Sequence, residues 1–192
     1  VDSEKLYSRF GFDIEKIEEY LITNIGEDKK LNKFNVEGIH FHLDGYSTKQ
    51  RSEALLQCIQ LIKKLNAQGF TFRFIDIGGG ILINYLESKT EWLDFDVRLK
   101  KSLKGEISPV TFNNNGLGYW LEDGIVKGER KTYPYYNEIN TNKFLNEILA
   151  YSDNSGSSIA SLLRDHNLEI RIEPGRSLVN QSGITMAKVV HR

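Results

Sequence analysis

The residues best suited to chemistry fall into three polar clusters, each placed where an apolar stretch of the chain ends. The clusters are His40-Phe41-His42, Asp76-Ile77-Gly78-Gly79-Gly80 and Glu173-Pro174-Gly175-Arg176. Histidine and carboxylate side chains can hold metals or move protons, and successive glycine amides can cradle an anion. Ligands of parallel α/β folds bind where the loops after the strands converge, so the three clusters predict one shared site.

Each cluster also has a structural interpretation when it is considered alone. The glycine triplet is equally consistent with a tight turn, because it fits neither the dinucleotide-binding pattern nor a Walker loop. His40 and His42 stand two apart in a predicted strand and therefore share a face, either as a metal pair or as one buried and one rim histidine. Glu173 and Arg176 flank a rigid proline-glycine turn and could form a structural ion pair there.

Two amphipathic helices with capping signals are predicted in the first part of the chain. One follows Asp13 as its N-cap and ends near Gly26. The other begins after Ser47, which resembles a capping box with Gln50, and it ends at Gly69. Apolar residues at helical spacing line one face of this second helix: Leu55, Cys58, Ile59, Ile62 and Leu65.

Strands predicted at 36–43 and 70–77 flank the second helix and complete a βαβ unit, which implies a parallel sheet covered by helices. The later part of the chain predicts helices at 92–103, 141–151 and 157–166, strands at 110–112, 168–172 and 184–190, and a hairpin formed by 119–121 and 125–126. These strands are too few for a complete eight-stranded barrel, which takes about 250 residues.

The composition is that of an ordinary globular chain, with 192 residues, 40% hydrophobic and 27% charged, which excludes wholesale disorder. A net charge of −1 argues against a nucleic-acid partner. The longest apolar run, 77–86, is about half of the ~20 residues that a membrane helix needs. The lone Cys58 cannot form an internal disulfide. We therefore expect a cytoplasmic protein with neither a nucleic acid nor a membrane as partner.

Together the three clusters resemble the fold-type III pyridoxal 5′-phosphate (PLP)-dependent decarboxylases, the group of diaminopimelate, ornithine and biosynthetic arginine decarboxylases. The resemblance rests on 38–43, 76–80 and 173–179 in this order, preceded by the short segment 8–12. It implies an α/β fold that is part of a (β/α)8 TIM-like barrel of the alanine racemase and decarboxylase type. It also implies PLP as the cofactor, a small amino acid as the substrate, and a homodimer in the full-length protein.

The resemblance implies a role for residues of each cluster. Glu173 matches the carboxylate that keeps the pyridine nitrogen of PLP protonated, and His42 matches the histidine stacked on the cofactor ring, so both are expected to be catalytic. A carboxylate at this position favours decarboxylation over the racemase branch of the fold, which places an arginine there. His40 and Asp76 are expected to support these residues from behind rather than to contact the cofactor themselves. The expected cofactor-binding residues are His42, Gly78, Gly79, Gly80, Glu173, Gly175, Arg176 and Ser47.

The sequence also departs from the family pattern. The loop after His42 reads Leu43-Asp44-Gly45-Tyr46-Ser47, with an added acidic residue and a tyrosine, so Ser47 reaches the phosphate only if this altered loop allows it. No lysine lies in the context of the family's Schiff-base lysine, which is on an early barrel strand. We therefore expect residues 1–192 to be the central and late portion of the PLP-binding barrel domain. The early strands and the C-terminal β-domain are absent, 105–137 form an irregular insertion, and this part alone is expected to be inactive.

Two other functions remain open. A PLP-fold protein that has lost its lysine could act as a non-catalytic binding protein. A metal-dependent barrel hydrolase could also use a strand-end pair such as His40 and His42, but it needs three or four ligands. The other histidines, His166 and His191, lie outside a ligand context. No metal is therefore expected.

Overall fold

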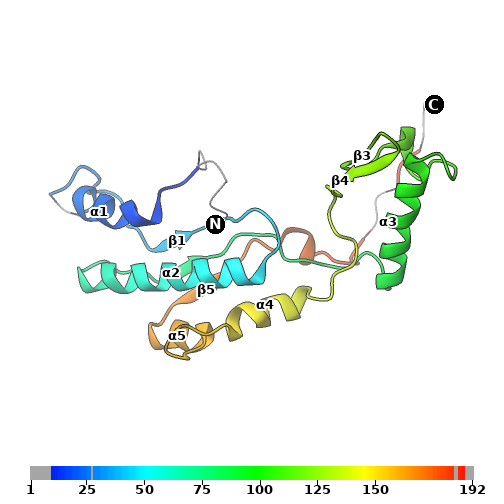
Figure 1. Cartoon of the computed structure of the whole chain (residues 1–192). Helices are drawn as coiled ribbons and strands as arrows, with labels where there is room; N and C mark the ends of the chain where they lie inside the picture. The colour runs from blue at the N-terminus through cyan, green and yellow to red at the C-terminus, as the bar shows by residue number, and fades with distance from the viewer. Residues whose placement is uncertain (1–9, 27, 184–185, 189–192) are drawn as a thin grey trace. The chain divides into compact units, whose positions relative to one another are not determined.

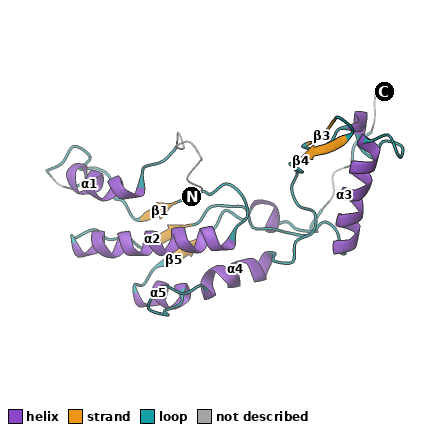
Figure 2. Cartoon of the chain, in the orientation of Figure 1, coloured by secondary structure: helices purple, strands orange, loops and turns teal. Residues whose placement is uncertain are grey.

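The computed structural model describes residues 10–26, 28–183 and 186–188 (Figure 1). The chain divides into two compact units, the first formed by 1–81 and 142–178 and the second by 82–141 and 179–192. Helices and loops make up most of the chain, and the strands are short (Figure 2). Among the described residues, no helix combines the length and the apolar character that crossing a membrane requires.

A parallel sheet of three strands organises the first unit, in the order β1-β2-β5. β1 is Gly38–His40, β2 is Phe74–Asp76 and β5 is Glu169–Arg171. The register pairs His40 with Asp76 and Asp76 with Arg171, so the three strands end at the same level. These strands confirm the predicted α/β class and the parallel sheet, but they form an open sheet, so the barrel remains a prediction for the longer protein.

Helix α2, Thr48–Ala67, carries the core of the first unit and connects β1 to β2 as predicted. Its N-cap is Ser47, whose hydroxyl accepts a hydrogen bond from the Gln50 amide over 3.1 Å. Its C-terminal end is tied to the chain before β2, because the Phe72 amide donates to Asn66 Oδ1 over 2.9 Å. The predicted apolar face is buried, and each fully buried aliphatic side chain there contributes roughly 1.5–3 kcal/mol. That face consists of Leu55, Cys58, Ile59, Ile62 and Leu65.

The other helices of the first unit also follow the sequence signals. α1, Ile14–Asn24, begins at the predicted N-cap Asp13, which accepts from the Glu15 amide. α4, Thr141–Ala150, buries Phe144 and Ile148, and α5, Ile159–Asp165, contacts α2. Their buried side chains belong to the apolar core, as does Ile75 of β2, which is completely buried.

The second unit contains the residues predicted to form an irregular insertion, 105–137. Its elements are α3, Lys89–Leu103, and the hairpin of β3, Tyr119–Glu122, and β4, Ile125–Gly128. The hairpin turn has positive φ at Asp123 and Gly124, as the sequence pattern predicts. Asp96 joins α3 to this hairpin region, because it accepts from the Tyr119 hydroxyl over 2.9 Å and pairs with Arg130 at 3.2 Å.

Several predicted boundaries were wrong. The strands expected at 36–43 and 70–77 are limited to Gly38–His40 and Phe74–Asp76, where the ladder pairs them. α3 begins before residue 92, because Ser88 caps it by accepting from the Thr90 amide. The strands expected at 168–172 and 184–190 also differ. The first is shortened to Glu169–Arg171, and the second lies mostly outside the described residues, although 186–188 are described and form no strand.

The strand expected at 110–112 is also wrong, because the chain turns there instead of extending. A 3-10 helix spans Phe112–Asn114. Asn113 and Asn114 have φ angles of 51° and 49°, in the left-handed region that asparagine tolerates better than most residues. The asparagine cluster therefore ends the extended chain before a strand can form.

Candidate functional site

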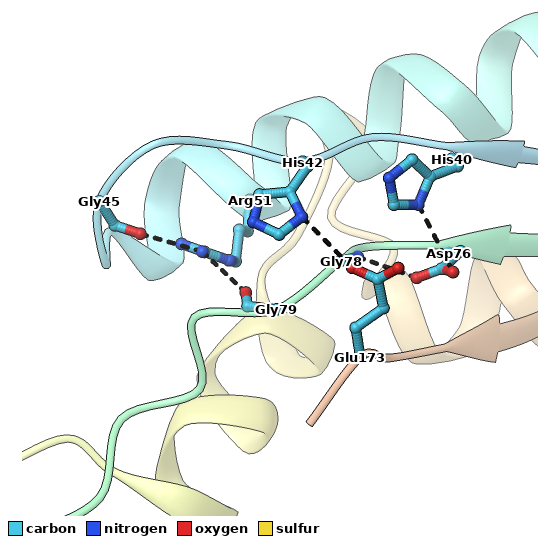
Figure 3. Close-up of polar contacts among 8 residues, drawn as sticks. All are labelled: His40, His42, Gly45, Arg51, Asp76, Gly78, Gly79 and Glu173. Carbon is cyan, nitrogen blue, oxygen red and sulfur yellow. Dashed lines mark hydrogen bonds and ion pairs between the residues drawn. The ribbon is translucent and has the colours of Figure 1, made fainter. Parts of the chain in front are cut away.

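The three predicted clusters meet at one edge of the sheet, just beyond the ends of β1, β2 and β5. His40 and Asp76 are paired at the last position of their strands, and Glu173 follows β5 by two residues. Figure 3 shows His42, Gly78 and Glu173 gathered at this edge, with Gly79 and Arg51 beside them. The sequence prediction that the strand ends would converge is therefore confirmed, whereas the roles of these residues remain predictions.

Two histidine-carboxylate pairs cross the strand ends. His40 Nδ1 lies 3.4 Å from Asp76 Oδ2, and His42 Nδ1 lies 3.3 Å from Glu173 Oε2. The side chains of His42 and Glu173 are 58% and 53% exposed, so both remain accessible to a ligand. The edge thus presents an imidazole and a carboxylate side by side, held by different strands.

The glycine triplet packs closely against these side chains. Gly78 has a φ of +68°, and a Cβ added there would lie 2.9 Å from both His42 Nδ1 and the Phe41 carbonyl oxygen. A Cβ on Gly79 would lie 3.0 Å from the Glu173 carbonyl oxygen. Glycine at these positions lets the chain pass directly beneath the histidine ring.

Hydrogen bonds fix the direction of the triplet's peptide groups. The Gly78 amide donates to Asp76 Oδ1 over 2.9 Å, and the Gly78 carbonyl accepts from the Glu173 amide over 3.0 Å. In the part of the chain that the structure describes, the amides of Gly79 and Gly80 donate to no protein group. Two adjacent amide donors are therefore left for an anion.

The segment after β5 forms the rigid turn that the sequence predicts. Gly175–Ser177 is a 3-10 helix with Pro174 as its N-cap, and Gly175 has a φ of +51°. The Ser177 amide and hydroxyl both bond to the Pro174 carbonyl, at 3.0 and 2.7 Å. This turn carries the exposed Arg176, three residues after Glu173, at the same end of the sheet.

Sequence reasoning missed Arg51, the most buried charged residue of this region, whose exposed fraction is 1%. Its guanidinium donates to the carbonyl oxygens of Gly45 and Gly79, each over 3.0 Å (Figure 3). Burial lowers the pKa of the Arg51 guanidinium, and an electrostatic interaction with Tyr46 opposes this shift. A signal was present, because Arg51 stands four residues before Leu55 and so lies on the buried stripe of its helix.

A cavity of about 770 Å³ adjoins the two histidines. It is lined by His40 and His42 together with apolar side chains of α1 and α2, including Leu21 and Leu61. Its size is within the range of small-molecule sites.

The same edge offers a set of possible metal ligands. His40, His42 and Glu173 each present one ligand atom, and these atoms all lie within 4.8 Å of one another. The sequence argument against a metal counted histidines only and did not include Glu173 as a third ligand. Two histidines with one carboxylate form a known type of metal site, so the geometry keeps this alternative open.

Comparison with known proteins shows the family of the chain, which bears on the choice between a pyridoxal phosphate site and a metal site. The family described as "Pyridoxal-dependent decarboxylase, pyridoxal binding domain" matches residues 2–112, more than half of the chain. The chain belongs to this family. Its cofactor is therefore pyridoxal phosphate, as the family resemblance implied.

A curated relative extends the similarity beyond the matched domain. The "Uncharacterized protein y4yA" of Sinorhizobium fredii (strain NBRC 101917 / NGR234) is 29% identical over 182 residues. The alignment covers 95% of this chain but 35% of that protein, so the chain spans about a third of its relative's length.

The residues at the sheet edge fit a pyridoxal phosphate group. The amides of Gly79 and Gly80 suit a phosphate, and the accessible carboxylate of Glu173 suits a protonated ring nitrogen. The Ser47 hydroxyl accepts the Gln50 amide as the cap of α2, which leaves its own proton free to donate. Among the described residues, no lysine lies on a strand of the three-stranded sheet, and Lys49, Lys63 and Lys64 lie on the exposed side of α2.

Proposed function

We propose that this chain is the cofactor-binding part of a PLP-dependent decarboxylase that acts on a basic or dicarboxylic amino acid. The observation that carries the proposal is the meeting of Glu173, His42 and the glycine triplet at one sheet edge in a chain of the pyridoxal-binding family. In this proposal, the longer protein forms the barrel and a homodimer in the cytoplasm. The Schiff-base lysine comes from a segment outside this chain.

Each residue has a distinct task in the proposed site. Glu173 holds a proton on the cofactor's ring nitrogen, and His42 packs on the face of the ring. When bound, the pyridinium supplies an electron sink for the bond that breaks at the amino-acid substrate. A carboxylate at Glu173 keeps the nitrogen charged, which supports loss of CO₂ rather than the racemisation for which the fold uses an arginine.

The phosphate is assigned to backbone and guanidinium donors. The amides of Gly79 and Gly80, together with Arg176, form the proposed anion site, with Gly78 beneath the His42 ring and Gly175 allowing the turn that carries Arg176. Ser47 can donate its hydroxyl proton to the phosphate while it accepts the Gln50 amide, provided that the altered loop after His42 brings it within reach. Backbone amides and a guanidinium are the usual ligands of a phosphate.

The deciding experiment uses the full-length protein, incubated with PLP, reduced with borohydride and mapped by peptide mass spectrometry. We expect one labelled lysine, located outside residues 1–192. Reversible PLP binding without a labelled lysine would identify the non-catalytic relative, and absence of PLP binding would overturn the cofactor assignment.

The metal alternative is supported by the His40, His42 and Glu173 ligand set and has its own test. We expect the full-length protein purified with PLP to contain less than stoichiometric zinc, manganese or iron by elemental analysis. A stoichiometric metal that is lost on His40→Ala substitution would instead favour the barrel hydrolase.

A further inference from the structure

Arg51 is a buried cation that has no counter-ion among the described residues. It lies in the first turn of α2 with 1% of its surface exposed, and within the described residues it makes no ion pair. Charged side chains are rarely buried unless an opposite charge compensates them. Its Nε is also buried without a hydrogen-bond partner in the described structure. The arrangement is therefore one that a nearby anion would stabilise.

The guanidinium connects the loops on both sides of the proposed phosphate site. Its terminal nitrogens donate to Gly45 and Gly79 over 3.0 Å each and to the Ser47 carbonyl over 3.4 Å. Its planar group also lies 5.4 Å from the ring centre of Phe144 on α4. Arg51 thereby joins the loop after β1 to the glycine triplet after β2.

The contact with Gly79 determines where the next amide points. In a trans peptide, the C=O and the following N–H point in opposite directions. Because the Gly79 carbonyl is directed at Arg51, the Gly80 amide is directed away from it. The same reasoning applies to the preceding peptide. Because the Gly78 carbonyl accepts from the Glu173 amide, the Gly79 amide is directed away from that bond. A donor on the carbonyl also polarises the peptide and strengthens its N–H as a donor.

The triplet and Arg51 are fitted to each other. A Cβ on Gly80 would lie 2.4 Å from an Arg51 terminal nitrogen, and Gly80 has a φ of +82°. A side chain at position 80 would therefore displace the guanidinium. The close approach places a full positive charge behind the Gly80 amide, which has no acceptor among the described residues.

We infer that Arg51 is a positioning residue for a phosphate monoester, acting from behind the glycine triplet without contacting the ligand. It directs the Gly80 amide, joins the two loops and offsets the charge of the bound dianion. This inference rests on the proposed function, because the ligand it serves is the cofactor's 5′-phosphate.

The test compares two probes that differ only in the phosphate. Pyridoxine 5′-phosphate and pyridoxine are titrated into the full-length protein by fluorescence, and as alcohols neither forms a bond to lysine. Arg51→Met should weaken binding of the phosphate ester about tenfold or more and change pyridoxine binding less than about twofold. Arg51→Lys should lie between, because an ammonium keeps the charge but lacks the planar group that spans Gly45 and Gly79.

Two matched variants separate positioning from stability. Ile62→Ala removes a buried side chain of the same helix, and Arg164→Met removes an exposed arginine of the same unit. Both should leave the ratio of the two affinities unchanged. If Arg51→Met does not fold, Arg51→Lys decides by the same ratio.

The outcomes distinguish this inference from the proposed function. If the Arg51 variants keep the ratio of the affinities for pyridoxine 5′-phosphate and pyridoxine, even when both affinities fall, the role of Arg51 is overturned while the cofactor assignment stays intact. If the unsubstituted protein binds PLP no better than phosphate-free pyridoxal, the proposed cofactor site itself fails.

Discussion

His42 Nδ1 lies 3.3 Å from Glu173 Oε2, although 131 positions separate the two residues in the sequence. Each comes from a loop at the end of a different strand, and both side chains are more than half exposed. Their contact therefore depends on the parallel register of the sheet and leaves both groups available. In the proposed site the two have different tasks, so substitutions can separate them.

Replacing Glu173 should reduce turnover more than cofactor binding. We expect Glu173→Gln in the full-length protein to lower kcat by roughly 10²-fold or more, because an amide cannot hold the ring nitrogen in its protonated form. PLP affinity should change little, since the proposed phosphate donors remain. Glu169→Gln is the control, because Glu169 is an exposed carboxylate at the start of β5, the strand that precedes Glu173. Unchanged kcat in Glu173→Gln would remove the electron-sink assignment.

Arg176 should show the opposite pattern. Loss of a charged hydrogen bond to a phosphate costs about 1.5–3 kcal/mol, which corresponds to roughly 10- to 100-fold in affinity. We expect Arg176→Ala to weaken PLP binding by this amount in an equilibrium titration, with kcat at saturating PLP largely retained. A titration identical to that of the unsubstituted protein would contradict a phosphate contact.

Gly80→Ala should destabilise the protein more than Gly69→Ala. Both glycines have positive φ, at +82° and +93°, so both substitutions carry a backbone strain of about 1–2 kcal/mol. The Gly80 methyl group would also collide with Arg51, whereas nothing lies within 4 Å of a Cβ at Gly69. We expect Gly80→Ala to lose an additional ~1–3 kcal/mol in thermal unfolding of the full-length protein. Equal losses would show that Arg51 moves aside freely.

Features that depend on local spacing could be predicted from the sequence. Asp13 and Ser47 cap the helices that they were expected to cap. These signals could be recognised because a cap and an apolar stripe depend only on residues a few positions apart. The meeting of the three clusters was also predictable, since parallel strands end at one edge. The family followed from these clusters and is confirmed by the matched domain.

Features that depend on distant partners could not be predicted. Strand length is set by where neighbours pair, so 36–43 was too long for β1. The docking of the hairpin through Asp96 joins residues of α3 and β3 whose spacing carries no pattern. The role of Arg51 required the position of the Gly79 carbonyl, which lies 28 residues away in the sequence.

Cys58 should be unreactive in the folded protein. It is 3% exposed, and burial raises the pKa of its thiol to about 12, so almost no thiolate forms near neutral pH. We expect iodoacetamide to leave the Cys58 peptide unmodified under native conditions and to modify it after unfolding. A cysteine placed at the neighbouring exposed position, Gln57→Cys, should react readily in the same sample. Comparable labelling of both positions in the folded protein would contradict the burial of Cys58.

Asp96 should stabilise the second unit. Burial raises the pKa of Asp96, but hydrogen bonds from Lys100 and Tyr119 and the charges of Lys100 and Arg130 outweigh it, so the pKa lies below that of an ordinary aspartate. The bond from Lys100 is 2.7 Å long, and Arg130 also lies over the Trp92 ring at 3.6 Å. We expect Asp96→Asn to reduce the free energy of unfolding of this unit by about 1–3 kcal/mol at neutral pH.

The pH dependence of this effect follows from the lowered pKa of Asp96. A carboxyl group with a lower pKa in the folded state adds stability above its unfolded-state pKa, and this stability is lost as the pH falls through the folded-state value. The difference between the unsubstituted protein and Asp96→Asn should therefore be largest at neutral pH and shrink as the pH falls below the usual pKa range of an aspartate. Hydrogen exchange of the β3–β4 amides measures it locally, with the exposed Asp94→Asn as the control. A difference that stays constant into this acid range would mean that the ionised carboxylate of Asp96 does not hold the hairpin on α3.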